Sequence, residues 1–224
     1  MCFIPYITDL LTCADKALLL FINGLHTPAL DVVMWVLSDR WVWIPLYMLL
    51  AWLLIRRVGP VAGLTALVLL AGLIFATDQT CATLIRPAIA RLRPTNPDNP
   101  LSTAMTIVNG YRGGSYSFPS CHAANTMALA VFLSLVYRHR FMTLSIIVWS
   151  IIVSYSRVYL GVHYPSDIFA GFLVGSFFAF VFYYIYRYVC NRSYVRRRAP
   201  LVGWRSLRSL FSVVGQDENN GGCA

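Results

Sequence analysis

Five stretches of the chain are apolar and free of charged residues, and each approaches the roughly 20 residues that a helix needs to cross a bilayer. Extended where necessary into their polar flanks, they predict membrane-crossing helices at 41–55, 61–77, 121–137, 141–156 and 168–186. A sixth stretch, 17–37, is interrupted by Asn23, Gly24, His26 and Pro28. It predicts either a broken span or an interfacial helix followed by a short inserted helix.

Composition agrees with this pattern, because 58% of the 224 residues are hydrophobic and only 12% are charged. A soluble domain of this length would need a more polar surface. The predicted fold class is therefore all-α, an integral membrane helical bundle of about six helices with the first one broken or partly interfacial. We expect residues 1–199 to form a single membrane-embedded domain and residues 200–224 to form a basic, amphipathic to disordered cytoplasmic tail.

The net charge of +9 comes almost entirely from arginine, since Lys16 is the only lysine. These arginines lie at the ends of apolar runs and not on a water-soluble module, so no nucleic-acid partner is expected. The positive-inside rule places connections 56–57 and 138–140, and the C-terminal tail, in the cytoplasm. Segment 86–120 and turn 157–166 then face the opposite side, where their arginines need another explanation. A phosphate site would provide one.

Three polar clusters lie at the predicted outer ends of different helices, namely residues 86–94, residues 118–122 and residues 156–167. The guanidinium groups of Arg86, Arg93 and Arg157 offer forked donors that match phosphate oxygens, and they stay charged at any working pH. Together they would bind a dianion and stabilise charge on a transferring phosphoryl group.

Ser120 follows Pro119, and this pair predicts a helix start with Ser120 as the N-cap. The free backbone N–H groups of Cys121 and the next two residues would then point at an anion, helped by the helix dipole. We therefore expect Ser120 and Cys121 to bind phosphate together with the arginines.

Two histidines complete the predicted site. His163 precedes Asp167 by four residues, so the carboxylate can fix the tautomer of the ring and raise its basicity. An imidazole oriented in this way is a competent nucleophile towards phosphorus. His122, on another helix, is placed to protonate the leaving oxygen and later to accept a proton from the attacking water. No carboxylate cluster suited to magnesium or zinc accompanies them in the sequence, so neither a metal nor a cofactor is expected.

Taken in order, these motifs resemble the three-part signature of the type 2 phosphatidic acid phosphatases. The matching strings lie between residues 86 and 167, and they are Arg86-x6-Arg93-Pro94, Pro119-Ser120-Cys121-His122 and Ser156-Arg157-x5-His163-x3-Asp167. Each string alone is weak, but the ordered combination is specific. Vanadate-dependent haloperoxidases share the signature, but they are soluble proteins and match this apolar chain poorly.

The resemblance implies a phosphohistidine intermediate at His163, oriented by Asp167, with His122 as the acid. It also implies a phosphate cradle formed by Arg86, Arg93, Ser120, His122 and Arg157. Two positions depart from the family pattern, because Arg86 stands where lysine is usual and Cys121 where glycine is usual. Both departures bear on the fit of the substrate more than on the class of reaction.

The N-terminal stretch 21–41 is similar to small bacterial members that act on undecaprenyl diphosphate, phosphatidylglycerol phosphate or the lipid A 4′-phosphate, and it does not choose among them. The implied function is hydrolysis of a phosphorylated membrane lipid at the periplasmic face of the inner membrane, with the C-terminus in the cytoplasm. The lipid tail would enter sideways between helices. The alternative is a catalytically silent transporter or scaffold for anionic lipid. An intramembrane hydrolase using Ser120 or Cys121 lacks a convincing base.

Three further charged residues have open interpretations. Arg91 and Arg112 are candidates for contacts with an acidic lipid headgroup. Asp78 lies inside an apolar run, where an unpaired charge costs roughly 2.5 to 3.5 kcal/mol. We expect Asp78 to be protonated, paired or facing a polar cavity, either as support for the site or as a helix-packing contact.

Overall fold

The chain folds into a bundle of helices, seen in a computed structural model that describes residues 3–192, with side chains described for residues 12–190. Its elements, in chain order, are α1 (Phe3–Asn23), α2 (Pro28–Ser38), η1 (Arg40–Trp43), α3 (Ile44–Val58), α4 (Pro60–Gln79), the π-helical turn η2 (Thr80–Ile85), α5 (Arg86–Ile89), η3 (Pro100–Ala104), η4 (Val108–Gly110), α6 (Cys121–Tyr137), α7 (Arg140–Tyr159) and α8 (Pro165–Arg192). The predicted tail 200–224 lies outside the described residues.

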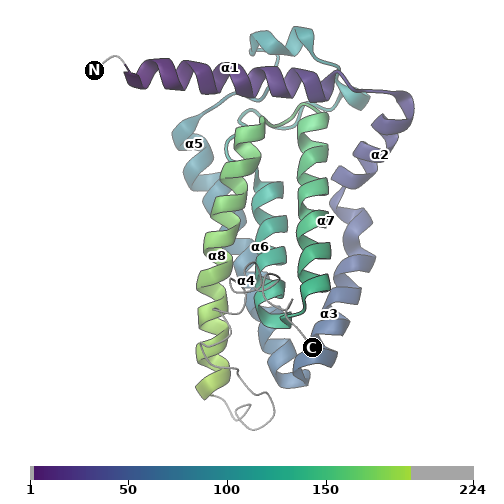
Figure 1. The fold of residues 1–224 in the computed structure, drawn as a ribbon, viewed down its shortest axis with the longest axis vertical. Helices are drawn as coiled ribbons and strands as arrows, with labels where there is room; N and C mark the ends of the chain where they lie inside the picture. Colours follow the sequence, from purple (N-terminus) through teal and green to yellow (C-terminus); the bar gives the residue numbers. More distant parts are fainter. Residues whose placement is uncertain (1–2, 193–224) are drawn as a thin grey trace, which may run out of the picture.

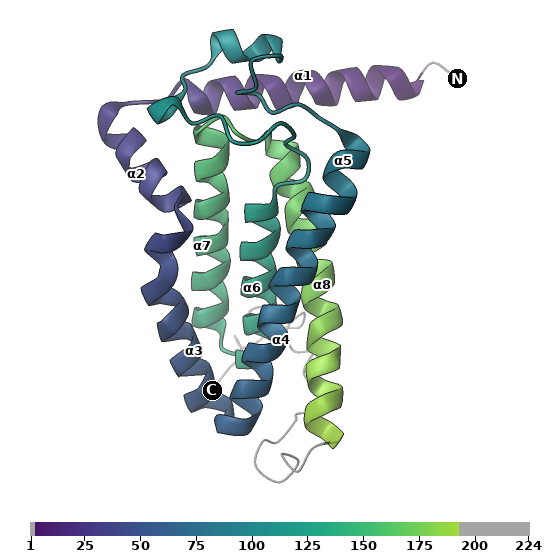
Figure 2. The same cartoon turned by 180° about the vertical axis from the view of Figure 1, so that it is seen from behind.

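Four described helical segments are long and apolar enough to cross a membrane, and they are Arg40–Val58, Pro60–Ile89, Arg140–Tyr159 and Pro165–Cys190. Helix α6 is shorter, with 17 residues, and packs against α4, α7 and α8 in the middle of the bundle (Figure 2). These five helices coincide with the five predicted apolar runs. The prediction of an all-α membrane bundle is confirmed.

The interrupted first segment, predicted at 17–37, forms two helices with a sharp bend between them. Helix α1 lies across one end of the bundle, and α2 descends from it towards α3 after a bend of 116° (Figure 1). Thr27 caps α2 by accepting a hydrogen bond from the Leu30 N–H, and Pro28 starts the helix. Asn23 holds the corner, because its side chain donates to the carbonyl oxygen of Tyr159 at 2.9 Å. The predicted interruption is therefore present, and a bent helix pair of this kind fits both the broken span and the interfacial helix followed by a short inserted one.

The start of α6 is fixed against the start of α8. A Cβ atom at Gly171 would lie 2.6 Å from the carbonyl oxygen of Ser120, so only glycine permits this approach. The Ser120 N–H donates to the carbonyl oxygen of Asp167 at 3.0 Å. Two helix beginnings that carry predicted site residues are thereby brought together at the end covered by α1.

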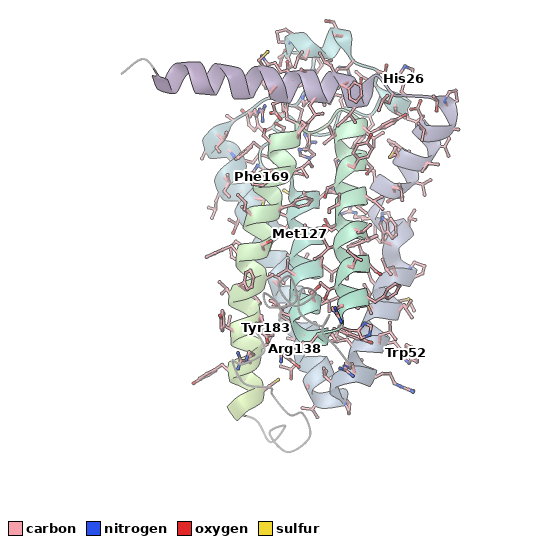
Figure 3. The ribbon with its side chains drawn as sticks, viewed as in Figure 1. His26, Trp52, Met127, Arg138, Phe169 and Tyr183 are labelled. Carbon is pink, nitrogen blue, oxygen red and sulfur yellow. The ribbon has the colours of Figure 1, made fainter. Side chains whose placement is uncertain are left out.

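The two predicted sets of arginines lie at opposite ends of the bundle. His26 lies at the end covered by α1, whereas Arg138, Trp52 and Tyr183 lie towards the opposite end (Figure 3). At that opposite end, the Arg56 guanidinium stacks over the Trp52 ring at 5.3 Å. The arginines assigned to the cytoplasmic connections and the arginines of the three motifs therefore occupy opposite ends.

Candidate active site

Arg93 and His163 meet beneath α1. Arg93 lies in the loop between α5 and α6, and its Nη1 is 3.5 Å from Nε2 of His163. The same nitrogen donates to the carbonyl oxygen of Val162 at 3.1 Å. Gly113 has a φ of +70°, and a Cβ atom there would come within 2.8 Å of the Arg93 guanidinium. This glycine therefore makes the room that the arginine occupies.

His163 lies in the turn before α8 and is 1% exposed. Its Nδ1 is 3.6 Å from Oδ2 of Asp167, which is longer than a normal hydrogen bond, and Nδ1 has no hydrogen-bond partner among the described residues. Hydrogen bonds of catalytic groups are often this long before a substrate is bound. The predicted contact is therefore present as a close approach and not as a formed hydrogen bond.

Burial holds the pKa of His163 well below its ordinary value, and the positive charges of Arg93 and Arg157 act in the same direction. The ring is therefore neutral at physiological pH. A neutral imidazole with one unprotonated nitrogen is the form that can attack phosphorus.

Asp167 is fully buried and accepts hydrogen bonds on both oxygens. Its Oδ2 accepts from the Tyr164 N–H at 2.8 Å, and its Oδ1 accepts from Nη1 of Arg91 at 2.8 Å. These two donors fix the carboxylate beside the His163 ring. Arg91 is thus engaged within the protein, and it also lies over the Tyr164 ring at 3.6 Å.

The other partner of Arg91 is Asp15, on α1. Asp15 accepts from Nη2 of Arg91 at 2.6 Å, and it accepts from the N–H of Ser166 at 2.9 Å and from its hydroxyl at 2.6 Å. It therefore caps the first turn of α8 from a helix 151 residues away in the chain. The sequence gives no local signal for this role, and Asp15 was missed.

Replacing Asp15 with alanine should lower kcat about 10- to 100-fold with little change in KM, because small displacements of reacting groups are this costly. The reason is that Arg91 and the first turn of α8 both lose the partner that aligns Asp167. Steady-state kinetics on a phosphorylated lipid would measure the effect, with the exposed Asp98→Ala as a control. Asp15→Asn, which keeps the acceptor oxygen, should recover part of kcat. An equal loss in Asp98→Ala, or a loss confined to KM, would contradict a positioning role.

Arg157 is 4% exposed and belongs to the last turn of α7. Its Nη1 donates to the Ser38 hydroxyl, and its Nη2 donates to the Tyr111 hydroxyl at 3.1 Å. Ser38 and Tyr111 come from distant segments and were missed by sequence analysis. Together they fix the orientation of the Arg157 guanidinium on the side of the bundle where α2 lies.

Arg86 follows the π-helical turn η2, a feature that often marks functional sites. Its Nη2 donates to the carbonyl oxygen of Pro119 at 3.2 Å and to the sulfur of Cys121 at 2.9 Å. Cys121, which replaces the usual glycine, therefore fixes the position of Arg86, which replaces the usual lysine. The two departures from the family pattern are in direct contact.

Ser120 caps α6, as predicted, and its hydroxyl accepts from the Ala123 N–H at 3.4 Å. His122, two residues later, borders two cavities. One is polar, measures about 380 Å³ and is lined also by Arg157, Tyr111 and Ser38. The other is apolar, measures about 710 Å³ and extends between α3, α4, α6 and α7. His122 thus stands where a polar space and an apolar one adjoin.

The three predicted phosphate-binding arginines share one feature. The Nε atoms of Arg86, Arg93 and Arg157 are buried and have no hydrogen-bond partner among the described residues. Within residues 12–190, none of the three forms an ion pair with a carboxylate. Burial, followed by the charges of Arg86 and Arg157, lowers the pKa of Arg93 to about 10. Guanidinium groups with buried, unsatisfied donors call for an anion, and the forked donors suit phosphate.

Arg112, another arginine of the loop between α5 and α6, is engaged elsewhere. Its Nη1 donates to the carbonyl oxygen of Thr95 at 2.8 Å, and the Thr95 hydroxyl donates back to the Arg112 carbonyl oxygen at 2.8 Å. Arg112 therefore holds the loop between α5 and α6 together, so its candidate role as a headgroup contact finds no support in this geometry.

Comparison with known proteins agrees with these features. The profile of the PAP2 superfamily matches residues 65–190. The lipid A 4′-phosphatase of Bacteroides thetaiotaomicron is 41% identical over 177 residues, which are 79% of this chain and 79% of that protein. An undecaprenyl-diphosphatase of Sulfolobus acidocaldarius is 34% identical over 142 residues, 63% of this chain and 62% of that protein.

The fold also has a counterpart among solved structures. A transmembrane PAP2-type phosphatidylglycerolphosphate phosphatase from Bacillus subtilis superimposes with a TM-score of 0.62 and 21% identity, covering 83% of this chain and 90% of that one. This likeness concerns the fold, whereas the matched profile and the 41% identical relative concern the family. From its motifs, its fold and these relatives, the chain belongs to the PAP2 superfamily.

Proposed function

We propose that the chain is a membrane lipid phosphatase that works without a metal ion. The observation that carries this proposal is the group of three guanidiniums whose buried Nε atoms lack hydrogen-bond partners in the described structure, next to a neutral buried histidine. Phosphate oxygens would satisfy these donors and compensate their charge. The arginines would supply the charge stabilisation that a metal provides in other phosphatases.

The proposed reaction proceeds in two displacements. In the first, Nε2 of His163 attacks phosphorus, the bond from phosphorus to the lipid oxygen breaks, and His122 gives its proton to that oxygen. In the second, His122 takes a proton from water, the hydroxide attacks the phosphohistidine, and inorganic phosphate leaves with His163 restored. Asp167 orients the ring in both steps, and Arg86, Arg93, Arg157, Ser120 and the Cys121 N–H hold the phosphoryl group.

The lipid tail would occupy the apolar cavity that borders His122. Among the lipids considered, the lipid A 4′-phosphate has the strongest support, because the 41% identical relative is named for that activity. The undecaprenyl-diphosphatase relative is less similar and covers less of the chain. The proposed location is the inner membrane, with the site facing the periplasm and the end carrying Arg56 and Arg138 in the cytoplasm.

The test is to offer the purified protein lipid A, undecaprenyl diphosphate and phosphatidylglycerol phosphate side by side in excess EDTA, and to compare initial rates of phosphate release. We expect the fastest release from lipid A and no loss of rate with EDTA. Absence of phosphate release from all three lipids would reject the phosphatase and favour a binding role. A rate restored only by a divalent cation would reject the metal-free mechanism.

The pH dependence should reflect the buried His163. Because its pKa lies well below 6.5, the ring stays neutral as the pH falls through that value, and kcat/KM should decline only at lower pH. The unfolded chain binds this proton near pH 6.5 and the folded chain does not, so the same group reduces stability below about pH 6.5. Profiles measured with a phosphate monoester and with a diphosphate would separate ionisation of the substrate from that of the enzyme. An acid limb centred at 6.5 or above with both substrates would contradict the prediction.

A further inference from the structure

The apolar cavity contains a polar pair that the proposed phosphoryl transfer does not use. Most of the described residues that line the cavity are aliphatic or aromatic, and Asp78 is the only acidic one among them. A carboxylate in an apolar membrane environment is costly unless something binds it. The Asp78 carboxylate therefore needs a hydrogen-bond donor in the cavity.

Asn125 provides one such hydrogen-bond donor. Its Nδ2 donates to Oδ1 of Asp78 at 3.0 Å, across the α4–α6 contact. A carboxylate has two oxygens and about four acceptor positions, and the amide uses one of them. No second donor to Asp78 is found among the described residues. Asn125 therefore orients the carboxylate and leaves acceptor capacity facing the cavity.

The position of the pair along the bundle limits what it can bind. Asn125 lies three residues after His122 on α6, so the two share a helix face and are separated by about 4.5 Å along the axis. Both line the same cavity. A group bound by Asp78 must therefore be carried near the head of the lipid, within about one helical turn of the phosphate.

The charge around the cavity limits the kind of donor. Arg40 and His122 also line it, and Arg157 lies in the adjoining cavity that His122 also borders. A cationic group on the lipid would be repelled there, whereas a neutral hydroxyl enters an apolar cavity at a smaller desolvation cost than a charge. A hydroxyl also donates a single, directional hydrogen bond to a carboxylate.

We propose that Asp78, oriented by Asn125, binds a hydroxyl group on the substrate's acyl chain close to the headgroup, and that the enzyme thereby selects hydroxyacylated phosphorylated lipids. This inference rests on the proposed lipid phosphatase activity and adds a second recognition point to it. The site arginines would recognise the phosphate, and Asp78 would recognise the acyl chain.

The experiment uses two synthetic phosphorylated glycolipids that are identical except for a 3-hydroxyl on the acyl chain. With the wild-type protein, kcat/KM should be about 10- to 100-fold higher for the hydroxylated lipid, the range expected for a hydrogen bond to a charged group. In Asp78→Leu this ratio should fall to about one. Asp78→Asn, which keeps the shape and a weaker acceptor, should give an intermediate ratio.

Leu70→Ala, in the wall of the same cavity, is the matched control, and it should lower kcat/KM for both lipids while keeping their ratio. Equal rates for the two lipids in the wild type, or an unchanged ratio in Asp78→Leu, would overturn the inference while leaving the phosphatase intact. If Asp78→Leu does not fold, the wild-type ratio and Asp78→Asn still decide. If the wild type hydrolyses neither these lipids nor those of the preceding test, the proposed function itself fails.

Discussion

His163→Ala should reduce phosphate release from lipid substrates by about 10⁴-fold or more, since loss of a nucleophile removes the covalent route altogether. The side chain is buried, and its Nε2 lies 3.5 Å from Nη1 of Arg93. The measurement is inorganic phosphate released in excess EDTA. In parallel, the wild type should yield an acid-labile phosphorylated histidine when it is quenched during turnover, and the variant should not.

His139→Ala is the matched control, because His139 is exposed in the α6–α7 connection at the opposite end of the bundle. It should retain full activity. A His163→Ala protein that folds and keeps wild-type turnover would remove the phosphohistidine from the mechanism. Retention of lipid binding together with loss of turnover would show that the arginines bind the phosphate independently of the chemistry.

Arg93→Met should lower kcat/KM by about 10²- to 10³-fold, the effect of removing one preorganised donor from a site that stabilises transition-state charge. Methionine fills a similar volume, so the loss would report charge and hydrogen bonding and not a cavity. Arg93→Lys should recover only part of the activity, because a point charge cannot reproduce the forked donor geometry. Steady-state kinetics on the preferred lipid would compare kcat/KM of the wild type, Arg93→Met and Arg93→Lys.

Arg140→Met, at the far end of the bundle, removes the same charge from an exposed position and should leave kcat/KM unchanged. Thermal unfolding of each variant in detergent would separate loss of activity from loss of fold. If Arg93→Met and Arg140→Met were equally active, Arg93 would be a structural residue of its loop.

The membrane helices were predictable because they depend on local hydrophobicity, which a single chain records directly. The same holds for the N-cap at Ser120, which depends on a few adjacent residues. That Arg93 and His163 lie on the same side of the bilayer was predictable from topology, because the connections between antiparallel spans alternate between the two sides. Their catalytic roles stay predictions.

Contacts between distant segments were not predictable. Asp15 precedes the first apolar run, where a charged residue is ordinary, and only the folded chain places it on Ser166 and Arg91. Ser38 and Tyr111 reach Arg157 for the same reason. The sequence also left Arg91 and Arg112 open as headgroup contacts, because an arginine that is engaged within a protein carries no pattern that distinguishes it from a free one.

The bond between α1 and the first turn of α8 has a consequence for how the protein matures. Asp15 is translated 151 residues before Ser166, so its partner on α8 emerges only after α2 to α7 have been made. The His163–Asp167 pair therefore acquires its final alignment only after α8 begins to insert. A nascent chain that stalls before Ser166 therefore lacks the first turn of α8 and the contact with Asp15 that holds it.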